Sequence, residues 1–220
     1  MSASPVDQSL AKFANRGARQ RRLLRAAFVC AGLVWAGFVG FGLERMWRFA
    51  TTPGAAAHAS REWPSSSLIT PRPGHATLVM FVHPQCSCTT ASLAELRNVL
   101  QRSRTPLSAW ILLLQPQGAA SEWQRARTAA EARLIANVTV VEDRDGSEAA
   151  RFDAQTSGQV VLFDAQGQLV YEGGITGSRG HEGDNAGERS VVSFLNTGVA
   201  DHREQPVFGC GLHDPQRSRI

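Results

Sequence analysis

The sequence predicts an α/β domain with a central mixed sheet flanked by helices, preceded by one N-terminal transmembrane helix. Two observations lead to this fold class. From about residue 76 onward, short apolar runs typical of buried strands alternate with segments of helical periodicity. Nearer the N-terminus, residues 26–43 contain no charged side chain over a length that matches the hydrocarbon core of a bilayer.

Charge is distributed unevenly along the 220 residues, whose net charge is +4. Residues 1–50 hold eight Lys or Arg against two Asp or Glu, so the rest of the chain has a small acidic excess. The basic character therefore belongs to the N-terminal segment. Because a nucleic-acid-binding domain needs a basic face of its own, we expect no nucleic-acid partner.

The predicted transmembrane helix covers residues 26–47. It separates a basic cytoplasmic segment, residues 1–25, from a linker, residues 48–67, that is rich in Pro, Ala, Ser and Thr. Because the Lys and Arg excess precedes the span, the N-terminus is expected inside. The prediction is a single-pass protein of the inner (cytoplasmic) membrane, with its domain in the periplasm or at the cell exterior.

Two features of this segment allow alternatives. Small residues at 55–59 resemble a signal-peptide cleavage site, but the apolar run is longer than the usual h-region of about 7–15 residues, which favours a retained anchor. Gly32, Ala36 and Gly40 form a small-residue face at a spacing of four, which would pair two helices in a homodimer. Glycine is also common in membrane helices, so an unpaired helix remains open.

The first half of the exported domain, which we place at residues 68–200, contains two buried strands and a helix. Residues 76–82 read ATLVMFV and residues 107–114 read LSAWILLL, both continuous apolar runs of strand length. Between them, residues 87–100 carry leucines at helical spacing, one apolar stripe that would face the sheet.

The second half continues the alternation and ends in a hairpin. A turn containing Gly167 separates two short apolar runs, which predicts antiparallel strands. Ser121 is a plausible N-cap for the helix that it precedes. The expected elements are a helix at 121–134, a strand at 138–142, a helix at 146–152, strands at 159–164 and 168–173, and a helix at 187–196. Residues 201–220 are predicted to form a C-terminal tail.

Cysteines mark the candidate site. Cys30 lies in the apolar run and acts as a small hydrophobe. The exported part holds Cys86, Cys88 and Cys210, an odd number that cannot all pair within one chain. Cys86 and Cys88 follow a strand at the start of a helix, where unsatisfied N–H groups favour a thiolate. His83 is expected to help set the pKa of Cys86.

The spacing of the first two cysteines leaves their pairing open. A disulfide between Cys86 and Cys88 would close a small, strained and therefore oxidising ring. The alternative is that one of them pairs with Cys210, which glycines flank in the sequence. In both cases thiol–disulfide exchange or electron transfer is the leading interpretation, and the catalytic candidates are Cys86, Cys88, Cys210 and His83.

The sequence also allows other interpretations of the cysteines. One alternative is an inert structural disulfide to Cys210. Another is a copper-type binding or delivery module that uses the cysteines together with a histidine such as His83, His181 or His213. A non-catalytic assembly factor is a further alternative. We predict no cofactor and assign no dedicated metal ligand. The glycine-rich residues 177–187 are either a solvated loop or a loop that carries Arg179 and His181 toward Cys86.

Three segments carry a family resemblance: residues 83–89 (HPQCSCT), residues 174–183 (GITGSRGHEG) and residues 208–210 (FGC). Over about residues 68–214 the chain resembles the thioredoxin-like superfamily and, more narrowly, the membrane-anchored RedB-type proteins of bacteria. The resemblance implies a thioredoxin-like fold, a membrane tether and a protein partner, still unknown, that offers a thiol or a disulfide. By position Cys86 resembles the attacking cysteine.

The chain departs from ordinary thioredoxins in two ways. The C-x-x-C motif is shortened to C-x-C. The proline that lines the substrate groove in the superfamily is absent, and residues 156–159 read TSGQ instead, which weakens the expectation of peptide-disulfide recognition and leaves room for a metal. The peroxiredoxin pattern is also missing around Cys86, so peroxide reduction of that type is not expected.

Overall fold

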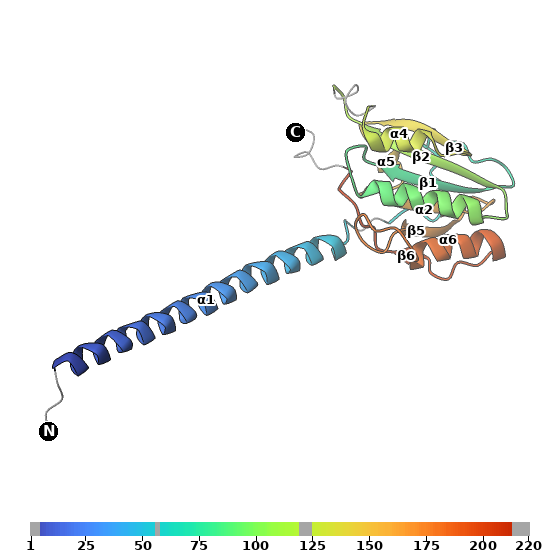
Figure 1. Ribbon diagram of the computed structural model, residues 1–220. Helices are drawn as coiled ribbons and strands as arrows, with labels where there is room; N and C mark the ends of the chain where they lie inside the picture. Colours follow the sequence, from blue (N-terminus) through green and yellow to red (C-terminus); the bar gives the residue numbers. More distant parts are fainter. Residues whose placement is uncertain (1–4, 56–57, 119–124, 213–220) are drawn as a thin grey trace. The chain divides into compact units, whose positions relative to one another are not determined.

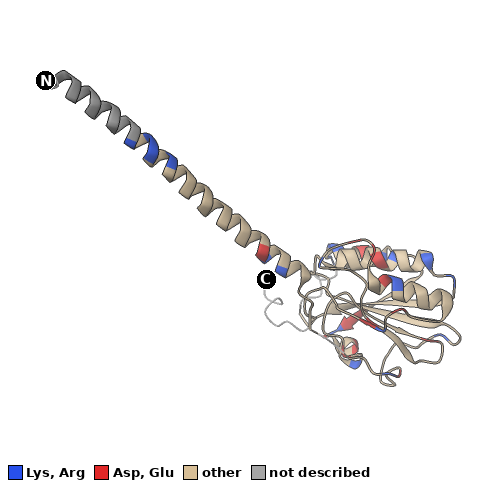
Figure 2. Cartoon of the chain, turned by 90° about the horizontal axis from the view of Figure 1, so that it is seen from below, with Lys and Arg blue, Asp and Glu red and all other residues tan. Residues whose placement is uncertain are grey.

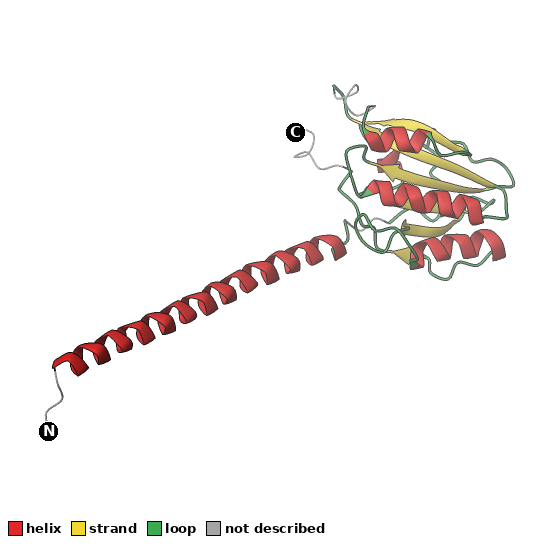
Figure 3. Ribbon diagram, viewed as in Figure 1, coloured by secondary structure: helices red, strands yellow, loops and turns green. Residues whose placement is uncertain are grey.

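The computed structural model describes residues 5–55, 58–118 and 125–212, with side chains from residue 19 onward. The chain divides into two units, Met1–Arg48 and Phe49–Ile220. The first is helical, and the second contains a sheet with helices packed against it (Figure 3).

Helix α1 (Pro5–Thr51) contains the predicted transmembrane segment (Figure 1). Its portion Arg19–Thr51 reaches a mean hydropathy of 2.0 in its most apolar window, and none of that window is buried. Large apolar side chains such as Phe28 and Trp35 are exposed. Figure 2 shows the basic residues of 19–25 ahead of the uncharged stretch. A helix of this length and composition fits a membrane anchor, and it also fits a signal sequence.

The helix begins much earlier than the sequence analysis predicted. It starts at Pro5, whereas the predicted span started at residue 26. Proline is favoured in the first helical turn, and the Ala, Leu, Arg and Gln residues that follow have high helix propensity. The basic segment therefore continues the apolar helix instead of forming a separate element.

The second unit is built on one six-stranded sheet in the order β3-β2-β1-β4-β5-β6. Strands β1, β2 and β3 are parallel, β4 is antiparallel to both β1 and β5, and β6 is parallel to β5. This is the expected mixed sheet. The strands are β1 (Ala76–Val82), β2 (Leu107–Gln115), β3 (Val138–Arg144), β4 (Gln159–Phe163), β5 (Leu169–Gly174) and β6 (Glu204–Gln205).

Helices cover both faces of the sheet because successive strand residues point to opposite sides. In β1, Leu78, Met80 and Val82 join one apolar cluster, with side chains from three helices. Val79 and Phe81 join a second cluster on the other face. The first face packs against α2 (Thr89–Arg102), α4 (Arg127–Arg133) and α6 (Ala186–Thr197), and the second against α5 (Ser147–Arg151).

Every predicted strand and helix of the domain has an observed counterpart, with shifted ends. The first helix starts at Thr89 instead of residue 87, because the preceding residues form a tight turn. Ser121, the predicted N-cap, lies outside the described residues, and the observed helix α4 begins at Arg127. The two-residue strand β6 was not predicted, because two residues are too short to give a periodic pattern.

After α6 the chain returns across the edge of the sheet through β6. Gly173 makes this approach possible: its φ is +137°, and a Cβ there would meet the backbone of Gln205. From there residues 206–212, which we call the C-terminal strap, run to the junction of β1 and α2. The sequence analysis placed these residues in a tail, but Val207 and Leu212 are buried.

Candidate functional site

The carboxyl end of β1 presents the first two cysteines. Beyond Val82 the chain turns, and the backbone N–H of Cys86 donates to the carbonyl of His83 at 2.9 Å. Cys88 is the N-cap of α2, and its side chain makes no capping hydrogen bond. The N–H groups of Thr89 and Thr90 donate to the carbonyls of Cys86 and Ser87. The backbone of Cys88 donates to the sulfur of Cys86, so the start of α2 stabilises negative charge on Cys86.

The third cysteine arrives on the C-terminal strap, far along the sequence. The N–H of Ser157 donates to the carbonyl of Cys210, and the N–H of Leu212 donates to the carbonyl of Gln155, both at 2.8 Å. An antiparallel bridge joins Thr156 to the strap between these two bonds. The strap thus pairs with the loop before β4 through an isolated bridge. This loop is the segment that stands where thioredoxins have their proline.

The structure brings all three exported cysteines into contact. A hydrogen bond from the thiol of Cys210 reaches the sulfur of Cys86, which also interacts with Cys88. The Cys86 side chain is only 1% exposed and that of Cys88 9%, whereas Cys210 is half-buried. All three are in the reduced state. The contact sets up exchange between Cys86 and either neighbour.

Hydrogen bonds lower the pKa of Cys86 to about 4. The largest cause is the thiol of Cys210, and the Thr89 side chain and the backbone groups of Cys210 and Cys88 add to it. Burial acts in the opposite direction but is outweighed. Cys86 is therefore a thiolate at neutral pH, which is the nucleophilic form and the better leaving group.

The hydroxyl groups of Ser157 and Thr89 form a hydrogen-bonded chain that ends at the Cys86 thiolate. The N–H of His83 donates to Oγ of Ser157 at 2.8 Å, and Oγ of Ser157 lies 2.7 Å from Oγ1 of Thr89. Since Thr89 donates its hydroxyl proton to Cys86, Ser157 is the donor in its hydrogen bond with Thr89. Ser157 and Thr89 are each 1% exposed, so the network is closed to solvent.

The pKa of Cys88 is shifted in the opposite direction from that of Cys86. Burial raises its pKa, and the neighbouring charge of Cys86 raises it further, while Arg179 lowers it in part. Arg179 also donates from Nη1 to the carbonyl of Gly209 in the strap. The glycine-rich loop thus brings Arg179 to the cysteines, whereas His181 is exposed. At neutral pH Cys88 remains a thiol beside the Cys86 thiolate.

His83 is buried beside this site, and its Nδ1 accepts a hydrogen bond from the N–H of Gln85 at 3.2 Å. Its backbone N–H and carbonyl support Ser157 and Cys86. The groups that shift the pKa of Cys86 do not include the His83 imidazole. The influence of His83 on that pKa therefore stays a prediction.

A metal-binding group was the main alternative for the cysteines. Over residues 5–55, 58–118 and 125–212, no set of three or more His, Cys, Asp or Glu side chains is arranged to hold a metal ion. His213, one of the histidines considered for it, lies outside these ranges. The sequence analysis overlooked Thr89 and Ser157 as site residues, although Ser157 stands in the stretch where the proline is missing.

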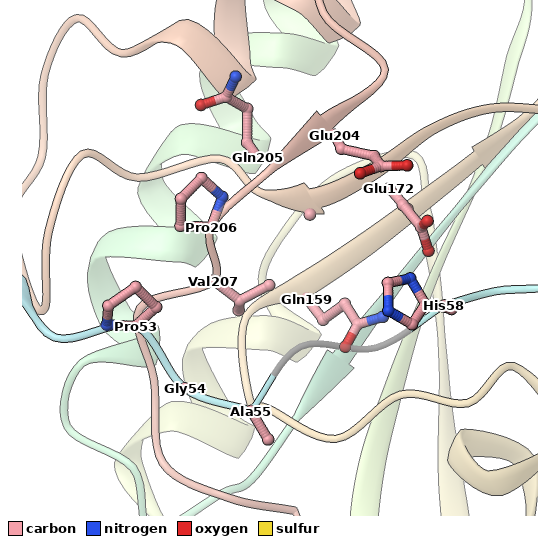
Figure 4. A pocket seen from close by; sticks show the side chains of 11 residues that line it. Pro53, Gly54, Ala55, His58, Gln159, Glu172, Glu204, Gln205, Pro206 and Val207 are labelled. Carbon is pink, nitrogen blue, oxygen red and sulfur yellow. The ribbon is translucent and has the colours of Figure 1, made fainter.

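Figure 4 shows a separate cavity of about 450 Å³. None of the three cysteines lines it. His58, Glu172 and Glu204 supply its ionisable side chains, and burial raises the pKa of Glu172. Pro206 and Val207, the first residues of the strap, form part of its wall. The cavity thus lies beside the origin of the strap, away from the sulfur atoms.

No protein-family model matches the chain, and no curated protein matches it. Among solved structures, an uncharacterised conserved protein from Geobacillus kaustophilus is 17% identical with a TM-score of 0.51, over 75% of this chain and 94% of that one. A hypothetical protein from Sinorhizobium meliloti is 17% identical with a TM-score of 0.49, over 73% and 93%. A secreted disulfide oxidoreductase from Mycobacterium tuberculosis is 20% identical with a TM-score of 0.36, over 44% and 67%.

At 17% identity and a TM-score of 0.51, the similarity to the Geobacillus kaustophilus protein concerns the fold alone. The narrower resemblance to RedB-type proteins is not shown by these comparisons and stays a prediction. The strand order, the cysteines at the end of β1 and the antiparallel hairpin of β4 and β5 agree with the expected architecture. The unit Phe49–Ile220 therefore has a thioredoxin-like fold, with three cysteines gathered where its first strand meets α2.

Proposed function

We propose that the chain is a membrane-anchored, extracytoplasmic thiol–disulfide oxidoreductase whose redox pair is Cys86 and Cys210. The observation that carries the proposal is the hydrogen bond from the Cys210 thiol to the buried Cys86 sulfur. A thiolate is the reactive form in disulfide exchange. A second thiol in direct contact with it is placed to complete the exchange.

The pairing with Cys210 is favoured over a pairing with Cys88. Cys86 and Cys88 interact through their side chains, but they are only two residues apart, so a disulfide between them would close a small, strained ring. A disulfide needs Cβ atoms that point toward each other at about 3.8 Å. Cys210 comes from a separate segment, so its bond to Cys86 closes no small ring. We therefore assign Cys88 the role of a thiol that interacts with the Cys86 thiolate.

The reaction balances with a partner dithiol as reductant. The partner loses two electrons as its two thiols become a disulfide. The Cys86–Cys210 disulfide accepts these electrons and is cleaved to a thiolate and a thiol. Because the site stabilises the Cys86 thiolate, the reduced protein is favoured and its disulfide is a strong oxidant. Oxidation of partner dithiols is thus the favoured direction.

The proposed location rests on α1 and on the chemistry. Basic residues precede its uncharged stretch, which favours a cytoplasmic N-terminus and an exported domain. Disulfides persist outside the cytoplasm, where the surroundings are oxidising. An anchored oxidoreductase would use its disulfide there.

A redox titration tests the proposal. Full-length protein in detergent, in a Cys30→Ser background, is equilibrated in glutathione buffers, acid-quenched, labelled with a maleimide mass tag and mapped by peptide mass spectrometry. We expect one two-electron transition that joins Cys86 to Cys210, with a midpoint more oxidising than about −200 mV. The absence of any reversible disulfide across the series would contradict the proposal.

A further inference from the structure

We infer that Cys210 is the cysteine that a partner thiol attacks, and that Cys86 is the leaving group. This inference rests on the proposed function, because it concerns the Cys86–Cys210 disulfide. It reverses the roles expected from sequence position, where Cys86 resembles the attacking residue. Access, the fixed position of the strap and the hydrogen bonds at Cys86 each support it.

Cys210 is more accessible to a partner than Cys86 is. Cys86 is 1% exposed and is in contact with Thr89 at the start of α2 and with Cys210 on the strap. Cys210 is the most exposed of the three exported cysteines. In exchange, the incoming thiolate approaches one sulfur along the line of the bond that breaks, from the side opposite to the other sulfur. Because Cys210 is partly exposed and Cys86 is buried, a partner thiolate reaches the sulfur of Cys210 more readily than that of Cys86.

The strap holds Cys210 without the disulfide. In the reduced state its carbonyl accepts from Ser157 N–H at 2.8 Å, and the carbonyl of Gly209 accepts from Arg179. The strap lies so close to the loop before β4 that a Cβ at Gly209 would come within 1.9 Å of the Ser157 carbonyl oxygen. Cleavage of the disulfide therefore leaves Cys210 in its place, still presented to a partner.

Cys86 is also the sulfur at which the site stabilises negative charge. Hydroxyl protons directed through Ser157 and Thr89, together with backbone groups of the site, point at the sulfur of Cys86. These donors lie at the sulfur of Cys86 in the reduced protein, so the thiolate that the reaction releases there is stabilised. The thiol of Cys210, by contrast, is itself a donor to Cys86.

The steps then follow in order. A partner thiolate attacks Sγ of Cys210, the bond to Cys86 breaks, and its electron pair stays on Cys86. The product is a mixed disulfide between the partner and Cys210. The partner's second thiolate next attacks the partner sulfur of this bond and forms the partner's disulfide. Cys210 leaves as a thiolate, takes up a proton and returns to the hydrogen bond with Cys86.

Adduct mapping tests the inference. Oxidised full-length protein in the Cys30→Ser background is mixed briefly with glutathione, acid-quenched and alkylated, and each cysteine peptide is quantified by mass spectrometry. We expect glutathione on Cys210 to exceed that on Cys86 by more than about tenfold at early times, with Cys86 alkylated. A Cys88→Ser variant, run in parallel, removes any transfer of the adduct to Cys88.

The outcomes separate this inference from the proposed function. A predominant adduct on Cys86 would overturn the inference and leave the oxidoreductase proposal in place. If peptide mapping before the addition of glutathione finds no Cys86–Cys210 disulfide, both fail. An adduct on Cys210 in both the parent protein and the Cys88→Ser variant supports the assigned roles.

Discussion

Removal of the Thr89 hydroxyl should raise the pKa of Cys86. Thr89→Val keeps the shape of the side chain and deletes the one donor that the chain of hydroxyl groups offers to the sulfur. A hydrogen bond to a charged group contributes about 1.5–3 kcal/mol, and one pKa unit corresponds to about 1.4 kcal/mol. The pKa of Cys86, about 4 in the parent protein, should therefore rise by about 1–2 units.

The assay is the thiolate ultraviolet absorbance of the reduced full-length protein as a function of pH. The first step belongs to Cys86, because the pKa of Cys88 is raised. Thr90→Val is the matched control, since Thr90 has no assigned contact with the sulfur. Thr89→Ser retains the hydroxyl and should keep the first step near its original pH. An unchanged first step in Thr89→Val would refute the hydrogen-bond argument.

Three further predictions follow from the same contacts. The pKa of Cys86 is lowered from 9.0 to about 4. Between these two pH values the free energy of unfolding of the reduced protein, relative to that of Cys86→Ser, should rise by up to about 1.4 kcal/mol per pH unit. Urea titrations at a series of pH values measure this difference. Arg179→Met should raise the pKa of Cys88 further, seen as a later thiolate step. Gly209→Ala should cost about 1–3 kcal/mol of stability and slow oxidation by glutathione disulfide, because its Cβ would collide with Ser157.

Matched control variants distinguish these effects from a general loss of stability. The sign of the first prediction follows from the depressed pKa: the stabilisation is complete above pH 9.0 and is lost as pH falls toward 4. Arg189→Met removes an exposed ion pair with Asp184 and should leave the thiolate steps unchanged. Gly177→Ala places a Cβ at an ordinary contact distance and should be nearly neutral. Equal effects in a variant and its control would contradict the corresponding prediction.

The sequence predicted the sheet and the Cys86 site because both depend on local pattern. Buried strands appear as apolar runs, and a helix that follows β1 places its first cysteines at an N-terminus. A pairing with Cys210 was one of two alternatives in the sequence analysis, but local pattern could not decide between them. It depends on a strap that has no periodicity and is held by backbone hydrogen bonds, which any sequence can make.

The roles of Thr89 and Ser157 could not be predicted from the sequence either. Both are common polar residues, and only the tertiary structure aligns their hydroxyl groups behind Cys86. Arg179 was foreseen as one of two alternatives for its loop, since glycine-rich segments serve both as solvated loops and as carriers of site residues. The extension of α1 to Pro5 was missed because hydropathy alone does not mark where an apolar helix begins.

The most direct test of the Cys86–Cys210 pair compares two single variants, Cys88→Ser and Cys210→Ser, in the Cys30→Ser background. Each full-length protein is oxidised with glutathione disulfide, and its disulfides are mapped by mass spectrometry. We predict that Cys88→Ser retains a reversible disulfide between Cys86 and Cys210, and that Cys210→Ser forms no stable intramolecular disulfide. A stable Cys86–Cys88 disulfide in Cys210→Ser, together with loss of the disulfide in Cys88→Ser, would contradict the account.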